Sequence, residues 1–223
     1  MGILKAENVY RSFERRGRRF DAVCDVSLEV PSGKITVISG RSGSGKSTLL
    51  NMLAGTLKPG SGTVTMDGRD LYAMNDRENS GLRSSAIGVI PQGKSLVMSL
   101  SVLDNVMLSY LLKGSVTPEI RDKATGALGR LGLSGLAEAA PKGLSGGEMR
   151  RVSIARVLIN MPDVILADEP TGDLDAGTTA TVLSLLREEA DRGAAVLLVT
   201  HETEAYGIAD ILYEMSEGKK YIK

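Results

Sequence analysis

The sequence has no tryptophan, a single cysteine, a single histidine and only two phenylalanines in 223 residues. One cysteine, Cys24, cannot form an internal disulfide, which excludes a small disulfide-stabilised domain and fits a reducing compartment. Neither charge is in excess, because 27 Lys and Arg residues balance 27 Asp and Glu residues. The chain therefore has no global field that favours nucleic acid or anionic lipid, and we expect no nucleic-acid partner.

Long apolar runs are missing as well. The longest, such as residues 194–199, are far too short to cross a bilayer. The first ten residues contain Lys5 and Glu7 and do not have the pattern of a secretory signal. We therefore expect a cytoplasmic protein that can still be peripheral on a membrane through another protein.

The order of apolar segments predicts the fold class. The chain length fits one domain of ordinary core size. Strand-like segments are expected at residues 3–10, 20–30, 34–39, 63–71, 86–90, 163–169, 194–200 and, as the final strand, 211–215. Helical segments are expected within 100–136 and at 178–193 and 202–209. The alternation of strands and helices predicts an α/β fold with a mainly parallel sheet covered by helices.

A glycine-rich stretch at residues 40–48, GRSGSGKST, matches the phosphate-loop pattern G-x-x-x-x-G-K-[ST]. An expected strand precedes it and an expected helix follows it, as this motif requires. Glycines let backbone N–H groups wrap phosphates, Lys46 reaches the β- and γ-phosphates, and the Ser47 hydroxyl suits Mg²⁺. The candidate nucleotide-binding residues are Gly40, Arg41, Ser42, Gly43, Ser44, Gly45, Lys46, Ser47 and Thr48.

Two carboxylates follow an apolar strand, in the sequence VILADEP. Asp168 and Glu169 stand at its carboxyl end, where ligands bind in open α/β sheets. Asp168 suits a magnesium contact, and Glu169 suits the orientation or deprotonation of an attacking water.

A second glycine-rich stretch, GLSGGEMRRVSIARVLIN at 143–160, opens a helix without following an expected strand. Ser145 offers a hydroxyl, and Gly146 and Gly147 offer N–H donors at the positive end of that helix. The chain thus has two glycine-rich helix starts that can each bind an anion, and these residues alone do not say why one domain has both.

Six stretches in order, GRSGSGKS, IPQGKS, LSGGE, VILADEP, TGDLD and VTHE, resemble the ATP-binding-cassette (ABC) ATPases, the nucleotide-binding subunits of membrane transporters. The resemblance covers nearly the whole chain. It implies a P-loop NTPase fold with a mainly parallel sheet and an N-terminal antiparallel β subdomain. It also implies a single ABC ATPase domain at 1–223, with a helical subdomain inserted at about 93–143.

The resemblance also implies residue roles. Lys46, Glu169 as general base, and His201 as the residue that holds the γ-phosphate and water would be catalytic. Mg²⁺ would be held by Ser47, Gln92 and Asp168. The signature residues Ser145, Gly146, Gly147 and Glu148 would bind ATP held by the partner subunit, and Asp175 would cross the dimer interface. Phe13 matches the aromatic residue that stacks on adenine, with Tyr10 as the alternative.

Departures from the pattern identify a subgroup. Met149 is unusual in the signature, and PTGDLD resembles the PTGNLD form of lipoprotein-releasing, macrolide-exporting, peptide-resistance and cell-division ATPases.

The resemblance implies an ATP-hydrolysing subunit that dimerises around two ATP molecules and powers an integral-membrane permease. Together they would form an exporter or a lipid- or peptide-extruding complex. A non-transporting, ATP-driven regulator of a membrane complex is the alternative. The interval from Gln92 to Leu144 is too short for the coiled coil of DNA-organising relatives. Met98 and Leu100 are candidates to face the membrane partner.

Overall fold

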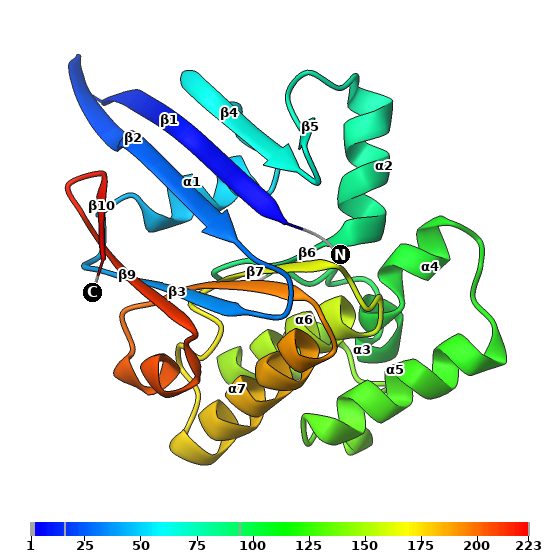
Figure 1. Cartoon of the computed structure of the whole chain (residues 1–223). Coiled ribbons are helices and arrows are strands. Elements are labelled where there is room, and N and C mark those ends of the chain that lie inside the picture. The colour runs from blue at the N-terminus through cyan, green and yellow to red at the C-terminus, as the bar shows by residue number, and fades with distance from the viewer. Residues whose placement is uncertain (1–2, 16, 94, 223) are drawn as a thin grey trace.

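The computed structural model describes residues 3–15, 17–93 and 95–222. In these ranges the chain forms two sheets with helices between and below them (Figure 1). The first sheet is antiparallel, in the order β2–β1–β4–β5. Its strands are β1 (Leu4–Arg15), β2 (Arg18–Val30), β4 (Ser61–Met66) and β5 (Arg69–Asp70).

The second sheet has the order β10–β9–β3–β8–β7–β6. Its strands are β3 (Ile35–Ser39), β6 (Ile87–Ile90), β7 (Val164–Asp168), β8 (Ala195–Val199), β9 (Ile211–Ser216) and β10 (Lys219–Ile222). Every neighbouring pair is parallel except β9 and β10. Parallel strands are buried on both faces, which explains why every residue of β3, β7 and β8 is buried and most of them are apolar.

Helices cover both faces of the parallel sheet. Their bounds are α1 (Lys46–Leu53), α2 (Asp76–Ala86), α3 (Val102–Val106), α4 (Leu108–Leu112), α5 (Pro118–Arg130), α6 (Gly146–Leu158) and α7 (Ala176–Asp191), with the 3₁₀ helices η1 (Ser134–Leu136), η2 (Pro141–Gly143) and η3 (Thr203–Ile208). None of the described helices has the length and hydropathy needed to span a bilayer.

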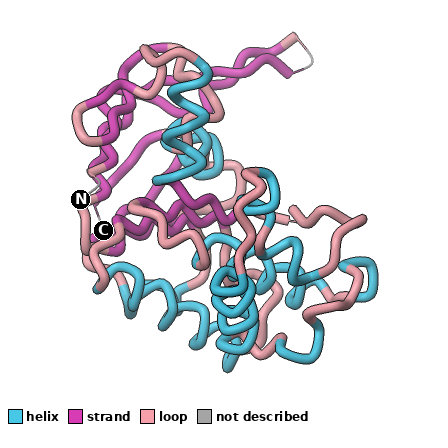
Figure 2. The backbone as a smooth tube through the Cα atoms, turned by 90° about the vertical axis from the view of Figure 1, so that its right-hand side faces the viewer, coloured by secondary structure: helices cyan, strands magenta, loops and turns pink. Residues whose placement is uncertain are grey.

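Two apolar cores follow from strand alternation. Val164 and Leu166 of β7 join α1 and the antiparallel sheet in one core, while Ile165 and Ala167 join α3, α5, α6 and α7 in the other. Figure 1 shows α1 enclosed between the two sheets and α6 and α7 side by side below the parallel sheet. Figure 2 shows the β1–β2 hairpin extending away from the rest of the chain.

The predicted α/β fold with a mainly parallel sheet and a separate N-terminal antiparallel sheet is confirmed. The sequence GRSGSGKST lies between β3 and α1, and Asp67 and Gly68 form the tight turn between β4 and β5. Between β6 and β7, the described residues form helices and loops without a strand, and Lys94 lies outside the described residues.

Several expected boundaries are wrong. The strand at 211–215 is not the last one, because Glu217 and Gly218 make a left-handed turn into β10. Helix α2 was not expected, since its sequence is polar and only Asn79 and Ala86 are buried. The helical run 102–112 is two short helices, broken at Met107. The strands of the first hairpin extend beyond the expected ranges 3–10 and 20–30, because β1 reaches Arg15 and β2 begins at Arg18; Arg16 lies outside the described residues.

Candidate active site

The phosphate loop is held in place by backbone contacts that only glycine permits. A Cβ atom on Gly40 would lie 2.2 Å from the Met215 carbonyl oxygen, and one on Gly45 would lie 1.9 Å from the Ala22 carbonyl oxygen. Both residues also have positive φ, at 146° and 103°. The loop is therefore fitted between β2 and β9, and its exposed side is left free for a ligand.

Lys46 is the first residue of α1 and is only 6% exposed. Its ammonium donates to the carbonyl oxygens of Gly40, at 2.7 Å, and Arg41, at 3.0 Å. These bonds curl the side chain back over the loop. The positive charge is thus held at the phosphate loop, in the pocket where a polyphosphate would bind.

A pocket of about 560 Å³ opens over this loop. It brings together most of the residues that the motifs single out. The lining residues are Phe20, Ala22, Arg41, Ser42, Gly43, Gly45, Lys46, Ser47, Thr48, Gln92, Asp168, Glu169 and His201. Five separate segments of the sequence therefore line the pocket: four lie at the carboxyl ends of β3, β6, β7 and β8, and the fifth is part of β2.

Glu169 follows β7 and lies in the left-handed region, with φ 50°. The buried Thr200 hydroxyl donates to its Oε2 atom at 2.9 Å, and His201 Nδ1 lies 2.9 Å from its Oε1 atom. The carboxylate is thus held by two side chains from the end of β8. Such support fixes a general base in one orientation.

Asp168 and His201 have shifted pKa values. Burial raises the pKa of Asp168, and the hydrogen bond from Ser47 partly opposes that shift. The hydrogen bond to Glu169, followed by its negative charge, raises the pKa of His201. The site therefore stabilises the protonated imidazole next to the carboxylate.

The residues predicted to hold Mg²⁺ fit that ion. Ser47 and Asp168 line the same pocket, and Ser47 lowers the pKa of the Asp168 carboxyl, so both side chains can offer an oxygen atom to one ion. Gln92 lines the same pocket and offers an amide oxygen. An all-oxygen donor set that leaves room for phosphate oxygens is what Mg²⁺ prefers.

The signature residues lie elsewhere. Ser145 caps α6: its hydroxyl accepts from the Glu148 N–H at 3.2 Å, and the Glu148 carboxylate accepts from the Ser145 N–H at 2.7 Å. The bond from the Ser145 N–H holds the pKa of Glu148 below its usual value. Gly146 has open space where a side chain would be. None of the residues 145–148 is among those that line the nucleotide pocket.

Asp175 caps α7, because its carboxylate accepts from the Thr178 N–H at 3.0 Å and from the Thr178 hydroxyl at 2.6 Å. It does not line the nucleotide pocket either. The loop that precedes it packs on the signature: a Cβ on Gly147 would lie 3.1 Å from Leu174. The signature and the loop before α7 therefore form one surface, separate from the phosphate loop.

Tyr10 and Phe13 lie on opposite faces of the first hairpin. Tyr10 contacts Asp21 and Arg19 through its hydroxyl, whereas Phe13 pairs with Phe20 at a ring-centroid distance of 5.8 Å. Since side chains alternate along a strand, Phe20 faces away from Arg19 and Asp21. Phe20 lines the pocket, so Tyr10 is on the wrong face to do so.

Sequence reasoning missed Arg150, which is 8% exposed. Its Nη1 atom donates to the carbonyl oxygens of Glu169, at 2.8 Å, and Asp168, at 3.2 Å. It thus ties the signature helix to the backbone of both acids. A basic residue in a signature helix looks like a surface residue in sequence, and no local pattern indicates that it is buried. Met149, the unusual signature residue, is also buried, and it packs in the core that contains α3, α5, α6 and α7.

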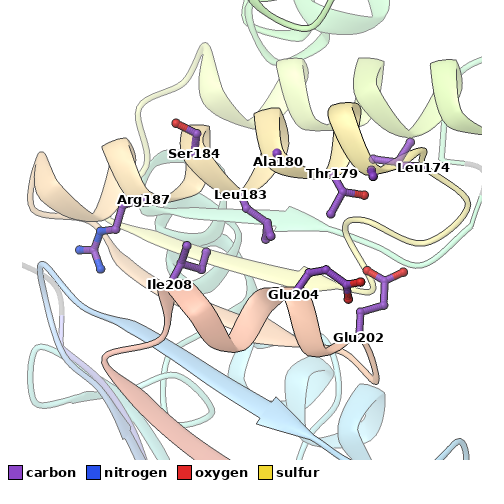
Figure 3. Close-up of a pocket in the computed structure, with 10 residues that line it drawn as sticks. Leu174, Thr179, Ala180, Leu183, Ser184, Arg187, Glu202, Glu204 and Ile208 are labelled. Carbon is purple, nitrogen blue, oxygen red and sulfur yellow. The ribbon is translucent and has the colours of Figure 1, made fainter.

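A second hollow, of about 730 Å³, lies between α7 and η3 (Figure 3). Leu174, Leu183 and Ile208 give it apolar walls, Arg187 stands at one end, and Glu202 and Glu204 stand at the other. Glu202 follows His201 directly and accepts a hydrogen bond from the buried Thr171 hydroxyl. The hollow between α7 and η3 is distinct from the nucleotide pocket, because the two share no lining residue.

Comparison with known proteins agrees with this geometry. The family model described as ABC transporter matches residues 23–172. The ABC transporter ATP-binding protein YtrE of Bacillus subtilis is 41% identical over 97% of this chain and 96% of its own length. The lipoprotein-releasing system ATP-binding protein LolD of Buchnera aphidicola is 36% identical over 98% and 96%. The chain also matches the macrolide export ATP-binding/permease protein MacB of Burkholderia pseudomallei at 40% identity, but covers 33% of that longer protein.

Solved structures give the same result. The dimeric bacterial ABC transporter cassette MJ0796 superposes with a TM-score of 0.92, at 32% identity and 98% coverage of both chains. A dimeric post-hydrolysis state of MJ0796, bound to ADP and Pi, superposes with a TM-score of 0.91. The match covers the antiparallel sheet, the parallel sheet and the helices alike. This chain therefore belongs to the ABC transporter family, as an ATP-binding and ATP-hydrolysing cassette of the subgroup that includes LolD, MacB and YtrE.

Proposed function

We propose that this cassette hydrolyses ATP at two sites shared between two copies of itself. One observation carries the proposal: the phosphate loop, Gln92, both acids and His201 line one pocket, while residues 145–148 and Asp175 form a separate surface. A chain that supplies two distinct parts of a site is completed by a second copy in a two-fold arrangement. The dimeric MJ0796 cassettes support this arrangement.

Each residue has a role in this proposal. Lys46 and the phosphate-loop N–H groups bind the β- and γ-phosphates, and the partner's signature closes over the γ-phosphate. Glu169 accepts a proton from the attacking water, and His201 holds the water and the γ-phosphate. Ser47, Gln92 and Asp168 would hold Mg²⁺, which neutralises phosphate charge when bound. Most of the catalysis is then electrostatic positioning around an in-line attack.

The partner outside the dimer is an integral-membrane permease, and the cassette is held by it at the cytoplasmic face of the membrane. LolD is part of a lipoprotein-releasing system, and MacB carries an ATP-binding part and a permease in one protein. These relatives favour an exporter or an extruding complex over a non-transporting regulator. Within 93–143, which we take as the helical subdomain of a single domain at 1–223, Met98 is half exposed and Leu100 is partly buried. Both follow Gln92 within eight residues of the sequence, and we infer that the pocket and a permease communicate through this segment.

Mixed dimers test the shared site. We combine a Lys46→Ala chain with a Ser145→Arg chain, each also carrying Glu169→Gln so that bound ATP persists. Each variant alone should remain monomeric with ATP on size-exclusion chromatography, since neither homodimer has an intact site. The mixture should elute partly as a dimer, because one site pairs an intact phosphate loop with an intact signature.

The control mixes Lys46→Ala with a chain that carries both substitutions. Neither chain then has a working phosphate loop, and no dimer should form. If the test mixture also stays monomeric at every ATP concentration, the two copies do not share the site.

A further inference from the structure

The nucleotide pocket contains an aromatic ring that no motif indicates. Phe20 lines it together with Ala22, Arg41 and Thr48. Its side chain is 46% exposed, although it is one of the two phenylalanines in the chain. A half-exposed phenyl ring at the rim of a phosphate site offers a flat apolar surface to a bound molecule.

The place of this ring is set by the phosphate loop itself. The Ala22 carbonyl lies so close to Gly45 that a Cβ atom there would be 1.9 Å away, so β2 rests directly on the loop. Phe20 and Ala22 are two residues apart and share one face of β2, which separates them by about 7 Å along the strand. The ring therefore stands beside the phosphate loop and not over it, where the nucleoside part of a bound nucleotide has to lie.

The ring of Phe13 packs against the ring of Phe20. Phe13 of β1 lies directly opposite Phe20 in the hairpin register, and the two ring planes are tilted by 30°. The Arg11 guanidinium lies over the Phe13 ring at 5.2 Å and donates to the Lys58 carbonyl at 3.0 Å. Phe13 is thus held between Arg11 and Phe20, and it limits the positions that the Phe20 ring can take.

We propose that Phe20 contacts the base of the bound nucleotide directly, and that Phe13 acts in part as a positioning residue for it. This inference rests on the proposed ATP site and adds a second aromatic residue to it. The base would stack on, or insert beside, a platform made of both rings instead of one. Stacking reads the flat face of a base, so the platform contributes affinity for any nucleoside triphosphate and none for a bare polyphosphate.

Paired ligands test the platform. Dissociation constants of ATP and of inorganic tripolyphosphate are measured by calorimetry without divalent cations, so that neither is hydrolysed. We expect Phe20→Leu, which keeps an apolar side chain, to weaken ATP binding about tenfold and to leave tripolyphosphate binding within about twofold. Phe20→Tyr, which keeps the ring, should bind ATP like the parent protein. Tyr221→Leu, at an exposed ring on β10, is the matched control and should change neither constant.

The outcomes separate the inference from the function on which it rests. If Phe20→Leu binds ATP as tightly as the parent, Phe20 is not a base contact. If it weakens both ligands equally, its effect is on the phosphate loop and the inference is also wrong. If the parent protein binds neither ligand, the ATP site itself fails. Thermal melting of Phe20→Leu and Phe20→Tyr confirms that both variants are folded at the temperature of the titration.

Discussion

At the scale of single residues, Glu169 is constrained in both its backbone and its side chain. Its φ of 50° is unusual for a residue with a side chain, and Thr200 and His201 hold its carboxylate. A residue kept in a costly conformation next to a phosphate loop is typical of a functional site. The arrangement agrees with the role of general base proposed for it.

Glu169→Gln keeps the length and planar end of this side chain, but an amide cannot accept the proton of the attacking water. We expect steady-state ATP hydrolysis to fall by about 10²–10⁴-fold, and ATP-dependent dimers to become stable on size-exclusion chromatography. Glu138→Gln, at an acid whose side chain is 81% exposed, is the control and should hydrolyse ATP normally. Normal turnover in Glu169→Gln would show that another group accepts the proton.

Arg150 is the residue that supports this conformation from the signature helix. Arg150→Gln removes the donors to the Glu169 and Asp168 carbonyls, and we expect kcat to fall about tenfold with little change in KM, because Arg150 does not line the pocket. Arg151→Gln is the matched control. Arg151 is the next residue of α6, but it donates to the carbonyl of Leu131, at the end of α5, and not to the acids. Arg151→Gln should lower the melting temperature without lowering kcat. Equal kcat values for the two variants would contradict the positioning role.

At the scale of elements, α1 is the helix on which the phosphate loop depends, and its C-terminal end is held by Tyr72. The Tyr72 hydroxyl lies 2.7 Å from the Met52 carbonyl oxygen and 2.6 Å from that of Leu57, and it donates its proton to this pair. Burial, partly offset by the bond to Leu57, raises the pKa of Tyr72 to about 12. The hydroxyl thus gives a second donor to the Met52 carbonyl near the end of α1, which also accepts from the Gly55 N–H, and ties it to the Leu57 carbonyl beyond the helix.

Tyr72→Phe leaves these carbonyls without that donor, and we expect the free energy of unfolding in urea to fall by about 1–2 kcal/mol. The raised pKa favours the neutral hydroxyl in the folded state. Its contribution is therefore present below pH 10 and is lost as the pH rises from 10 toward 12. Tyr221→Phe, at the half-exposed tyrosine of β10, should have no effect. An unchanged unfolding energy in Tyr72→Phe would mean that water replaces the hydroxyl at no cost.

At the scale of the whole molecule, Asp210 joins three segments that are distant in sequence. Its carboxylate accepts from the Ile35 N–H at 2.8 Å, from Arg187 of α7 at 2.7 Å and from Lys34 at 3.0 Å. Burial alone would raise the pKa of Asp210, but the Ile35 N–H, Arg187 and Lys34 together lower it to about 2. The start of β3, helix α7 and the loop before β9 are thus held by one ionised group.

Since the folded-state pKa is lowered, the stabilisation is complete above the unfolded value near 4 and is lost as the pH falls toward 2. Asp210→Asn should lower the free energy of unfolding by about 1–2 kcal/mol at pH 7, after allowance for the partly exposed carboxylate. The difference from the parent should shrink between pH 4 and pH 2. Asp122→Asn, at an exposed acid of α5, is the control. A difference that is independent of pH would rule out an ionic origin.

The sequence determined the class of the protein and the local parts of its site. The phosphate loop, the acids after β7 and the cap at Ser145 depend on residues within a few positions of one another, so their chemistry can be read directly from spacing. Their short apolar runs located β3, β7 and β8, because burial on both faces makes most of their residues apolar. The polar helix α2 and the short strand β10 have no such signal.

Only the tertiary structure decided which distant residues share the pocket. Phe20 lies beside the phosphate loop because Gly45 lets β2 approach it, and Arg150 reaches Glu169 because α6 packs beneath β7. The same folding leaves residues 145–148 outside the pocket that Lys46 and Glu169 line. These facts depend on close contacts between segments more than ten residues apart, and no local pattern of residue types specifies such a contact.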